Sequence, residues 1–193
     1  MPEADPEGPQ PIQRRTLTYE SWDDGDEFRI DARITDEQPA YGRLMHDMGF
    51  VVRVRKSDRV ITSIEPHMEA HPHSECPSIL PAFKQLEGVA VAKGFTREVT
   101  SRFTGPAGCA HLDQLARALG PVVTQAMIGL GMKARETGEG SAEETTSTYN
   151  RNTCHIWADG GVGQAKIKLG WLKTLHPNEY PAPPVAWFEE HAK

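Results

Sequence analysis

The stretch Gly105-Pro106-Ala107-Gly108-Cys109-Ala110-His111-Leu112 is a glycine-rich turn that runs directly into the most regular helical pattern of the chain. Between Leu112 and Leu130, apolar residues recur at helical spacing and form one stripe, whereas polar residues fill the opposite arc. Pro121 falls on the polar arc, where its missing amide costs least, and it should kink the helix. The turn therefore predicts an amphipathic helix on a core, with a thiol and an imidazole at its first turn.

The first third of the chain has the alternating pattern of half-buried strands. Phe28 to Thr35 places apolar residues on one face and charged residues on the other. Phe50 to Arg55 and Val60 to Glu65 follow the same period around a short polar turn, and Thr16 to Tyr19 adds a short strand. Asp36 to Gly42 is predicted to be a loop. Together with the helix, these strands predict an α+β fold in which an antiparallel β-meander with hairpins packs against two or three helices.

Three further segments are predicted to be regular. Pro77 to Leu86 has apolar residues at helical spacing and precedes Gly88, which favours the end of a helix. Val89 to Phe103 suits a second, interrupted helix. Thr153 to Trp171 alternates apolar and polar residues around a central glycine turn, and this pattern predicts a hairpin.

The composition of the two ends and of one internal segment predicts how the chain is divided. Residues 1–13 carry four prolines and few apolar side chains, so we expect a disordered tail. Residues 14–175 are predicted to form a single α+β domain, in which the acidic, hydroxyl-rich segment 133–150 is a mobile loop. Residues 176–193 are a proline-rich tail whose Trp187 and Phe188 favour docking, either on their own domain or on a neighbouring subunit.

The overall composition favours some partners and argues against others. Only 38% of the 193 residues are apolar, so we expect a homo-oligomer to complete the burial. The net charge is −6 without a basic block, which argues against a nucleic-acid partner. The chain has no run of 18 apolar residues and its N-terminus is acidic and proline-rich, so neither a membrane span nor a signal peptide is expected. Three widely spaced cysteines suit reduced thiols, and we predict a cytoplasmic protein.

The glycine-rich turn is the first candidate site. A thiol at a helix N-terminus is near free amides and the positive end of the helix dipole, so Cys109 with Gly108 and Ala110 suits an anionic group of a substrate. The alternative is that Cys109 is a small buried side chain. His111 is a candidate acid–base group, or a histidine that donates to a backbone carbonyl. If both residues belong to the helix, they lie about 200° apart, and only a later helix start would let them chelate one ion.

His46-Asp47 is the second candidate site. An imidazole beside a carboxylate is a usable acid–base pair because its pKa lies near operating pH, although adjacent residues on an extended segment point to opposite faces. The alternative is a polar loop dipeptide. Glu65, at the end of a predicted strand, is a further candidate for substrate binding.

Two metal sites are alternatives to acid–base chemistry. His67, His71, His73 and Cys76 fall in a predicted loop, but their spacing matches no strong zinc pattern, and a solvated surface explains them equally well. A mixed zinc or iron site would instead join residues that are distant in sequence, namely Cys76, Cys109, His111 and Cys154.

The order of motifs resembles a bacterial family, the domain of unknown function 2889 (DUF2889). The resemblance is carried by Arg43-Leu44-Met45-His46-Asp47-Met48 before a strand, by Cys76 after a hairpin, by Gly108-Cys109-Ala110-His111-Leu112 and by Cys154-His155. The family usually has Thr where this chain has Ala110. The resemblance spans about residues 14–160 and implies a role among pathways that degrade aromatic compounds.

These observations predict a small-molecule enzyme that needs no cofactor. The chain has no P-loop, no GxGxxG after a strand, no CxxC and no GxSxG, so non-redox chemistry fits best. His46 and His111 would be the acid–base groups, Asp47 would orient one of them, and Cys109 would bind an anion. A lyase that releases formaldehyde from an aromatic compound by a retro-aldol reaction, or an isomerase, is expected. A metal-binding protein or a non-catalytic subunit is the alternative.

Overall fold

The computed structural model describes residues 8–137, 151–171 and 181–191. The chain divides into two compact units, Met1–Val123 and Thr124–Lys193. The predicted domain over residues 14–175 therefore spans both units. Of the tail predicted over residues 1–13, the first seven lie outside the described residues, as do residues 138–150 of the predicted mobile loop.

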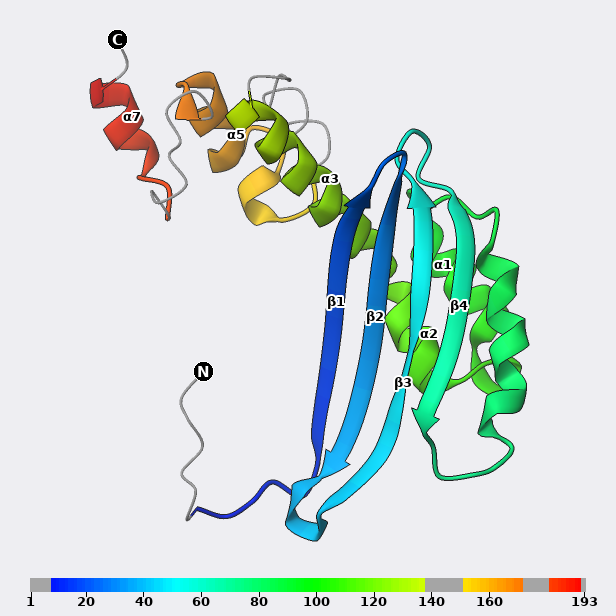
Figure 1. The fold of residues 1–193 in the computed structure, drawn as a ribbon. Coiled ribbons are helices and arrows are strands. Elements are labelled where there is room, and N and C mark those ends of the chain that lie inside the picture. The colour runs from blue at the N-terminus through cyan, green and yellow to red at the C-terminus, as the bar shows by residue number, and fades with distance from the viewer. Residues whose placement is uncertain (1–7, 138–150, 172–180, 192–193) are drawn as a thin grey trace. The chain divides into compact units, whose positions relative to one another are not determined.

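The first unit is built on an antiparallel β-meander of four strands (Figure 1). The strands follow one another in the sheet in chain order, and their bounds are β1 (Arg14–Asp24), β2 (Glu27–Gln38), β3 (Arg43–Arg55) and β4 (Ile61–Ala70). This arrangement confirms the predicted α+β fold with an antiparallel meander. The strands are longer than predicted, because neighbouring strands pair the polar ends that the sequence suggested were loops, including Asp36 and His67.

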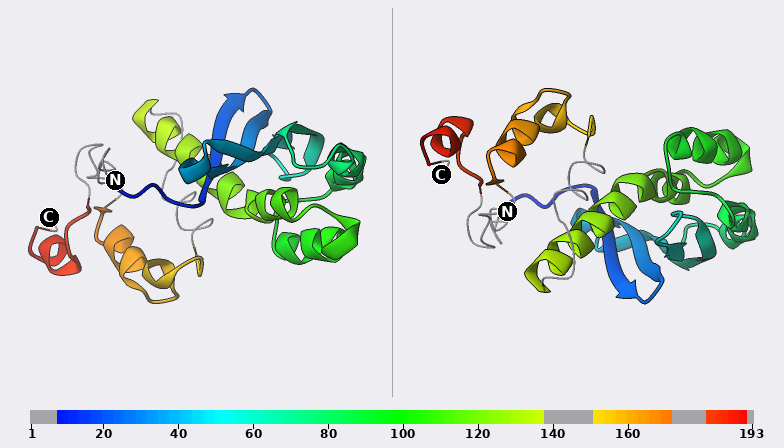
Figure 2. Two further views of the ribbon diagram at one scale, coloured as in Figure 1. Left: turned by 90° about the horizontal axis from the view of Figure 1, so that it is seen from below. Right: turned by 90° about the horizontal axis from the view of Figure 1, so that it is seen from above.

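Strand alternation gives the sheet one apolar face, the core face. Even-numbered side chains from Phe28 to Ile34 in β2 and from Met48 to Val54 in β3 are all buried. In β2 and β3 the odd-numbered positions carry most of the charges and form the outer face. Helices α1 (Phe95–Phe103) and α2 (Ala110–Arg117) lie against the core face in the views of Figures 1 and 2. Tyr19 of β1 donates its hydroxyl to the carbonyl of Leu115 in α2 at 3.1 Å, which ties the helix to the sheet.

The remaining elements of this region are mostly 3-10 helices. The predicted helix over Pro77–Leu86 is the 3-10 helix η2 (Cys76–Leu86), and η1 (Pro39–Tyr41) and η3 (Gly105–Ala107) are single turns. Phe83 of η2 stacks on Phe103 of α1 with ring centroids 4.3 Å apart, so η2 is held to the core by aromatic packing.

The long predicted helix is interrupted. α2 ends at Arg117, and α3 (Leu119–Thr137) follows after Ala118. Pro121 lies in the first turn of α3, where its missing amide breaks no helical hydrogen bond. The proline thus separates two helices where a kink within one was expected. The last residues of α3, Lys133–Thr137, are helical, whereas the sequence predicted that they belong to the loop 133–150.

The second unit is helical where the structure describes it. The hairpin predicted over Thr153–Trp171 is wrong, because this segment forms η4 (His155–Trp157) and α5 (Val162–Lys168). A Cβ at Gly163 would lie 2.7 Å from the ring of Trp157, so the two elements pack directly together. In the predicted C-terminal tail, α7 (Val185–His191) buries Phe188 and leaves Trp187 41% exposed.

One helical stretch, Ala110–Ala134, is long and apolar enough to cross a membrane by length and composition alone. The expectation that the chain has no membrane span stays a prediction, because length and composition do not test it. Five apolar side chains of this stretch are buried in the described structure, namely Leu112, Leu115, Ala116, Leu119 and Val123. Core packing thus accounts for the apolar character of its first half.

Candidate functional site

Three polar side chains form a row across the core face of the sheet. Asp36 of β2 pairs with Arg15 of β1 on one side and with His46 of β3 on the other. All three are in phase with the apolar residues of their strands, so they point toward α2 as those residues do. The sheet register itself therefore assembles the row.

Arg15 holds the carboxylate of Asp36 in place. Its Nε donates to Oδ1 at 2.7 Å and its Nη2 donates to Oδ2 at 2.7 Å, while the amide of Gln13 donates to Oδ1 at 3.1 Å. The hydrogen bonds from Arg15 outweigh the cost of burial and lower the pKa of Asp36 to about 2. Asp36 is only 6% exposed, and it is ionised at any physiological pH.

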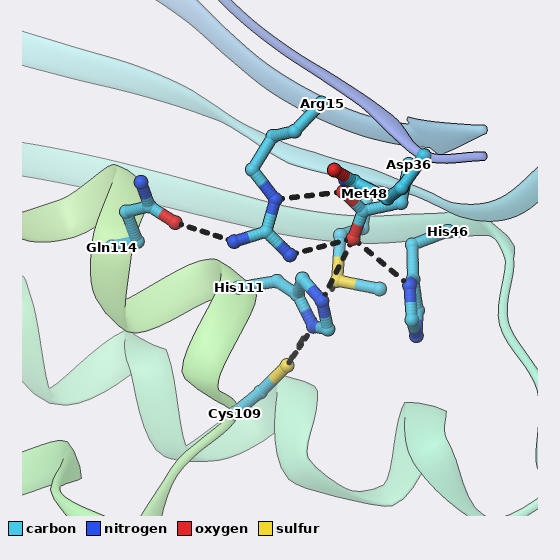
Figure 3. Close-up of polar contacts among 8 residues, drawn as sticks. Arg15, Asp36, His46, Met48, Cys109, His111 and Gln114 are labelled. Carbon is cyan, nitrogen blue, oxygen red and sulfur yellow. Dashed lines mark hydrogen bonds and ion pairs between the residues drawn. The ribbon is translucent and has the colours of Figure 1, made fainter. Parts of the chain in front are cut away.

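Two imidazoles share one oxygen of this carboxylate. His46 Nδ1 lies 3.1 Å from Asp36 Oδ2, and His111 Nε2 from the first turn of α2 lies 3.0 Å from the same oxygen. The two rings lie next to each other (Figure 3), and their centroids are 4.0 Å apart with the ring planes tilted by 35°. An ionised carboxylate only accepts hydrogen bonds, so His46 donates from Nδ1 and His111 from Nε2. His46 Nε2 and His111 Nδ1 are then the nitrogens that carry the lone pairs.

The surroundings of His111 favour its neutral form. Burial of the ring is the main cause that lowers the pKa of His111, and the nearby charge of His46 lowers it further. Asp36 acts in the opposite direction but does not cancel these effects. The imidazole is therefore ready to accept a proton near neutral pH.

Cys109 faces His111 because the helix begins one residue later than the thiol. Cys109 is the extended N-cap of α2, and its Sγ lies 3.8 Å from His111 Nδ1 and 3.9 Å from Met48 Sδ (Figure 3). The expected separation of about 200° applied only if Cys109 were helical. A Cβ at Gly108 would lie 2.1 Å from the carbonyl oxygen of Phe103, so the turn requires glycine at this position.

Arg15 also connects the carboxylate to the helix that carries His111. Its Nη1 donates to Gln114 Oε1 at 2.9 Å. One guanidinium therefore binds Asp36 of the sheet and Gln114 of α2, three residues after His111 in the chain. This contact, together with that of Tyr19, ties the helix that carries His111 to the sheet that carries His46.

Two cavities adjoin the imidazole pair. The first, which we call the sulfur-lined cavity, has a volume of about 640 Å³ and contacts Met48, Met68, Cys76, Cys109 and Ile79 among others. The second, which we call the polar cavity, has a volume of about 520 Å³ and contacts Gln13, Arg15 and Gln38 among others. His46 and His111 line both cavities, so either space gives a small molecule access to them.

The structure brings together most of the residues that the sequence predicted for catalysis, but it separates Asp47 from the others. His46, Cys109 and His111 line the sulfur-lined cavity together with Gly108 and Ala110. Asp47 does not orient a histidine of this site, because strand alternation turns it to the outer face. There its Oδ1 accepts a hydrogen bond from Arg33 Nε at 2.6 Å. Asp36 takes the role predicted for Asp47.

The other predicted residues are divided between the sulfur-lined cavity, which His73 and Cys76 line, and places away from the imidazole pair. Glu65 is exposed and pairs with Val51 on the outer face, and it lines neither of the two cavities. Cys76 lines the sulfur-lined cavity, whereas Cys154 belongs to the second unit. His67 also lies on the outer face, in register with Gly49.

A different set of ligands from the one predicted converges at the site. Within the described part of the chain, Asp36, His46 and His111 are the group of three whose ligand atoms lie within 4.8 Å of one another. A carboxylate and two imidazoles are ligand types for zinc and iron. However, Asp36 Oδ2 already accepts hydrogen bonds from Arg15 and both rings, and the guanidinium brings a positive charge to the same place. The arrangement fits a hydrogen-bonded acid–base centre better than a cation site.

Asp36, Arg15, Gln13, Gln114 and Met48 were not predicted from the sequence. A signal for Asp36 was present, since it continues the even-numbered series of Phe28, Ile30, Ala32 and Ile34. A carboxylate in phase with buried residues needs a partner, and this pattern marks a candidate site. Gln114 and Met48 carry no comparable signal, because their roles depend on where α2 lies.

The geometry defines an α+β protein with a carboxylate-bound pair of imidazoles between two cavities. The chain belongs to the family described as "Protein of unknown function (DUF2889)", which it matches over residues 13–125. This range contains the four-stranded sheet, the helices α1 and α2, and every residue of the acid–base centre. Searches of curated proteins and of solved structures give no match.

Proposed function

We propose that this protein is an enzyme that uses cofactor-independent acid–base chemistry on a small molecule. The proposed reaction is that of a carbon–carbon lyase, a retro-aldol cleavage that releases formaldehyde from an aromatic compound, with an isomerase as the alternative. The observation that supports it is the pair of imidazoles bound to one ionised carboxylate, both facing a cavity of about 640 Å³. Asp36 keeps both tautomers constant, so each ring offers one basic nitrogen to the substrate.

The retro-aldol step needs one base and one acid. The base removes the proton of a hydroxymethyl group, the carbon–oxygen double bond of formaldehyde forms, and the adjacent carbon–carbon bond breaks. The electron pair of that bond passes to a conjugated acceptor on the aromatic part, which then takes a proton from the acid. The substrate yields two products without an oxidant, a reductant or added water, which agrees with a site made of imidazoles and a carboxylate.

The two histidines suit these complementary roles. The lowered pKa of His111 makes it the base that is neutral before reaction. The ring centroids of His46 and His111 lie 4.0 Å apart. A proton on one ring therefore disfavours a proton on the other, and this repulsion promotes transfer of a proton from the pair to the product. The amides at the first turn of α2, next to Gly108 and Ala110, would stabilise negative charge that develops on the substrate.

Formaldehyde release from a panel of hydroxymethyl-bearing aromatic compounds tests this proposal. We expect His111→Gln and His46→Gln each to lower the rate about 10²- to 10⁴-fold, the usual contribution of a positioned acid or base. His155→Gln, an exposed histidine of the second unit, is the matched control and should retain the wild-type rate. Full activity in both site variants would refute the proposed roles.

A metal-dependent role is the second candidate, because the ligand atoms of Asp36, His46 and His111 converge within 4.8 Å. Elemental analysis of the purified protein distinguishes the two. Zinc or iron at one equivalent that is lost in Asp36→Asn would favour the metal site. A metal-free protein that still releases formaldehyde would favour the acid–base centre.

The proposal includes the setting of the enzyme. We propose a cytoplasmic bacterial enzyme of aromatic-compound catabolism that assembles as a homo-oligomer. The sequence resemblance supports bacterial aromatic-compound catabolism, the three widely spaced cysteines support the cytoplasm, and the low apolar fraction of 38% supports the homo-oligomer. Light scattering of the full chain tests the assembly, and a monomer at micromolar concentration would refute it.

A further inference from the structure

The sulfur-lined cavity gathers an unusual share of the sulfur atoms of the chain. The sequence has six methionines and three cysteines, and four of these residues, Met48, Met68, Cys76 and Cys109, line this one cavity. Thioether and thiol groups are polarisable, and methionine makes favourable contacts with the edges and faces of aromatic rings. The walls of this cavity thus suit a flat apolar group.

The polar cavity has a more hydrophilic lining. Seven of its eight lining residues are polar or charged, and Met45 is the exception. The seven are Gln13, Arg15, Asp36, Glu37, Gln38, His46 and His111. Such walls offer more hydrogen-bonding side chains to a small hydrophilic molecule, and less apolar surface to a ring, than those of the sulfur-lined cavity.

His46 and His111 form the boundary between these two spaces, because they are the residues that line both. A bond that breaks at the imidazole pair therefore has an apolar space on one side and a hydrophilic space on the other. A reaction that divides an aromatic substrate from a one-carbon hydrophilic fragment matches this arrangement.

We propose that the two cavities are separate subsites of one active site. The sulfur-lined cavity binds the aromatic ring of the substrate, and the polar cavity receives the hydroxymethyl arm and then the released fragment. This inference rests on the proposed lyase function for the identity of the fragment, whereas ring binding beside Met48 and Met68 is testable without any turnover.

The methionine methyl groups report directly on where a ring binds. We would label the full-length protein with ¹³C at the methionine methyl groups and titrate it with phenol, a ring that lacks the cleavable arm. The ring current should shift the signals of Met48 and Met68 in a saturable way and leave that of Met45 unchanged. Single replacements of each methionine by leucine assign the three signals.

Cavity-filling variants supply an independent control. Ile79→Trp adds bulk to the sulfur-lined cavity and should abolish the phenol-induced shifts, and Ser78→Phe is a second variant at the same wall. Met45→Trp adds bulk to the polar cavity and should preserve them. The inference is overturned if Met45 shifts as much as Met48 and Met68, if neither of these two shifts at millimolar phenol, or if Met45→Trp abolishes binding.

Kinetics with an active substrate then test the assignment of the polar cavity. Met45→Trp should lower kcat at least about tenfold and change KM by less than about threefold, because the ring subsite is intact while the fragment has no space. Ile79→Trp should mainly raise KM. A rise in KM alone in Met45→Trp would overturn the assignment. If phenol binds as expected but no compound releases formaldehyde, the lyase proposal fails and the ring subsite stands.

Discussion

The two faces of the sheet carry the same three residue types in very different surroundings. On the core face, Arg15, Asp36 and His46 form a cross-strand row. On the outer face, Arg33 binds Asp47 through two hydrogen bonds, and His67 of β4 lies close enough to lower the pKa of that carboxyl further. In both clusters the hydrogen bonds from an arginine are the main cause of the lowered carboxyl pKa.

The difference between the faces comes from the helix. α2 packs against the core face and adds His111 and Cys109, so that Asp36 binds two imidazoles beside two cavities. On the outer face Asp47 is also buried, but the side chain of its partner Arg33 is 55% exposed. An arginine, an aspartate and a histidine on a sheet are therefore not enough for a site. A second element must cover them and supply a cavity.

The largest expected effect separates the two aspartates by activity. Asp36→Asn replaces a carboxylate that accepts from both imidazoles, so their orientation and tautomers are lost. We expect formaldehyde release to fall about 10²- to 10⁴-fold, whereas Asp47→Asn should remain close to wild type. Equal losses in the two variants, measured as kcat/KM at pH 7, would contradict the distinction between the faces.

Gly49 offers a way to perturb the sheet next to the outer-face cluster without changing a residue of the acid–base centre. A Cβ there would lie 2.1 Å from the carbonyl oxygen of Ala32 and 2.9 Å from His67 Nε2. We expect Gly49→Ala to lower the free energy of unfolding by roughly 1–3 kcal/mol, as overpacking does, in urea denaturation. At a temperature where the variant stays folded, its activity should match wild type, and a large loss of kcat would show that the two faces are coupled.

The pH dependence of stability compares the same aspartates. The pKa of Asp36 is about 2 in the folded protein against 3.8 ordinarily, so its contribution is complete above pH 3.8 and is lost as pH falls toward 2. At about 1.4 kcal/mol per tenfold difference in proton affinity, this contribution is about 2 kcal/mol. The stability difference between wild type and Asp36→Asn should therefore shrink between pH 5 and pH 2. Asp47→Asn should show the same sign, because the pKa of Asp47 is also lowered.

The smallest effect concerns the helix-borne histidine. Burial and the neighbouring His46 lower the pKa of His111, so its imidazole signal should titrate with a midpoint below 6.5 in NMR spectra. The unfolded chain takes up this proton more readily, so the contribution of His111 to stability is lost as pH falls through its folded-state pKa. His46→Gln removes the second cause and should raise the midpoint. A midpoint that rises instead in Asp47→Asn would contradict the separation of the two clusters.

The sequence predicted the fold class and half of the acid–base centre. The alternation from Phe28 to Thr35 and the helical stripe after Leu112 indicated a meander packed on helices, because the periods of strands and helices differ. His46 and His111 were identified by residue type and position. The hairpin expected at Thr153–Trp171 was wrong, because this segment forms η4 and α5, with Trp157 packed on Gly163.

The carboxylate that binds His46 could not be predicted from neighbours in the sequence. Asp47 is adjacent to His46 in the chain, but one residue along a strand reverses the direction of a side chain. Asp36 is ten residues away, and the pairing of β2 with β3 places it opposite His46. Local pattern therefore determined which residues face the core and which types of chemistry they carry. Strand register and the position of α2 decided which of them meet, because those distances depend on pairing between segments that are remote in the chain.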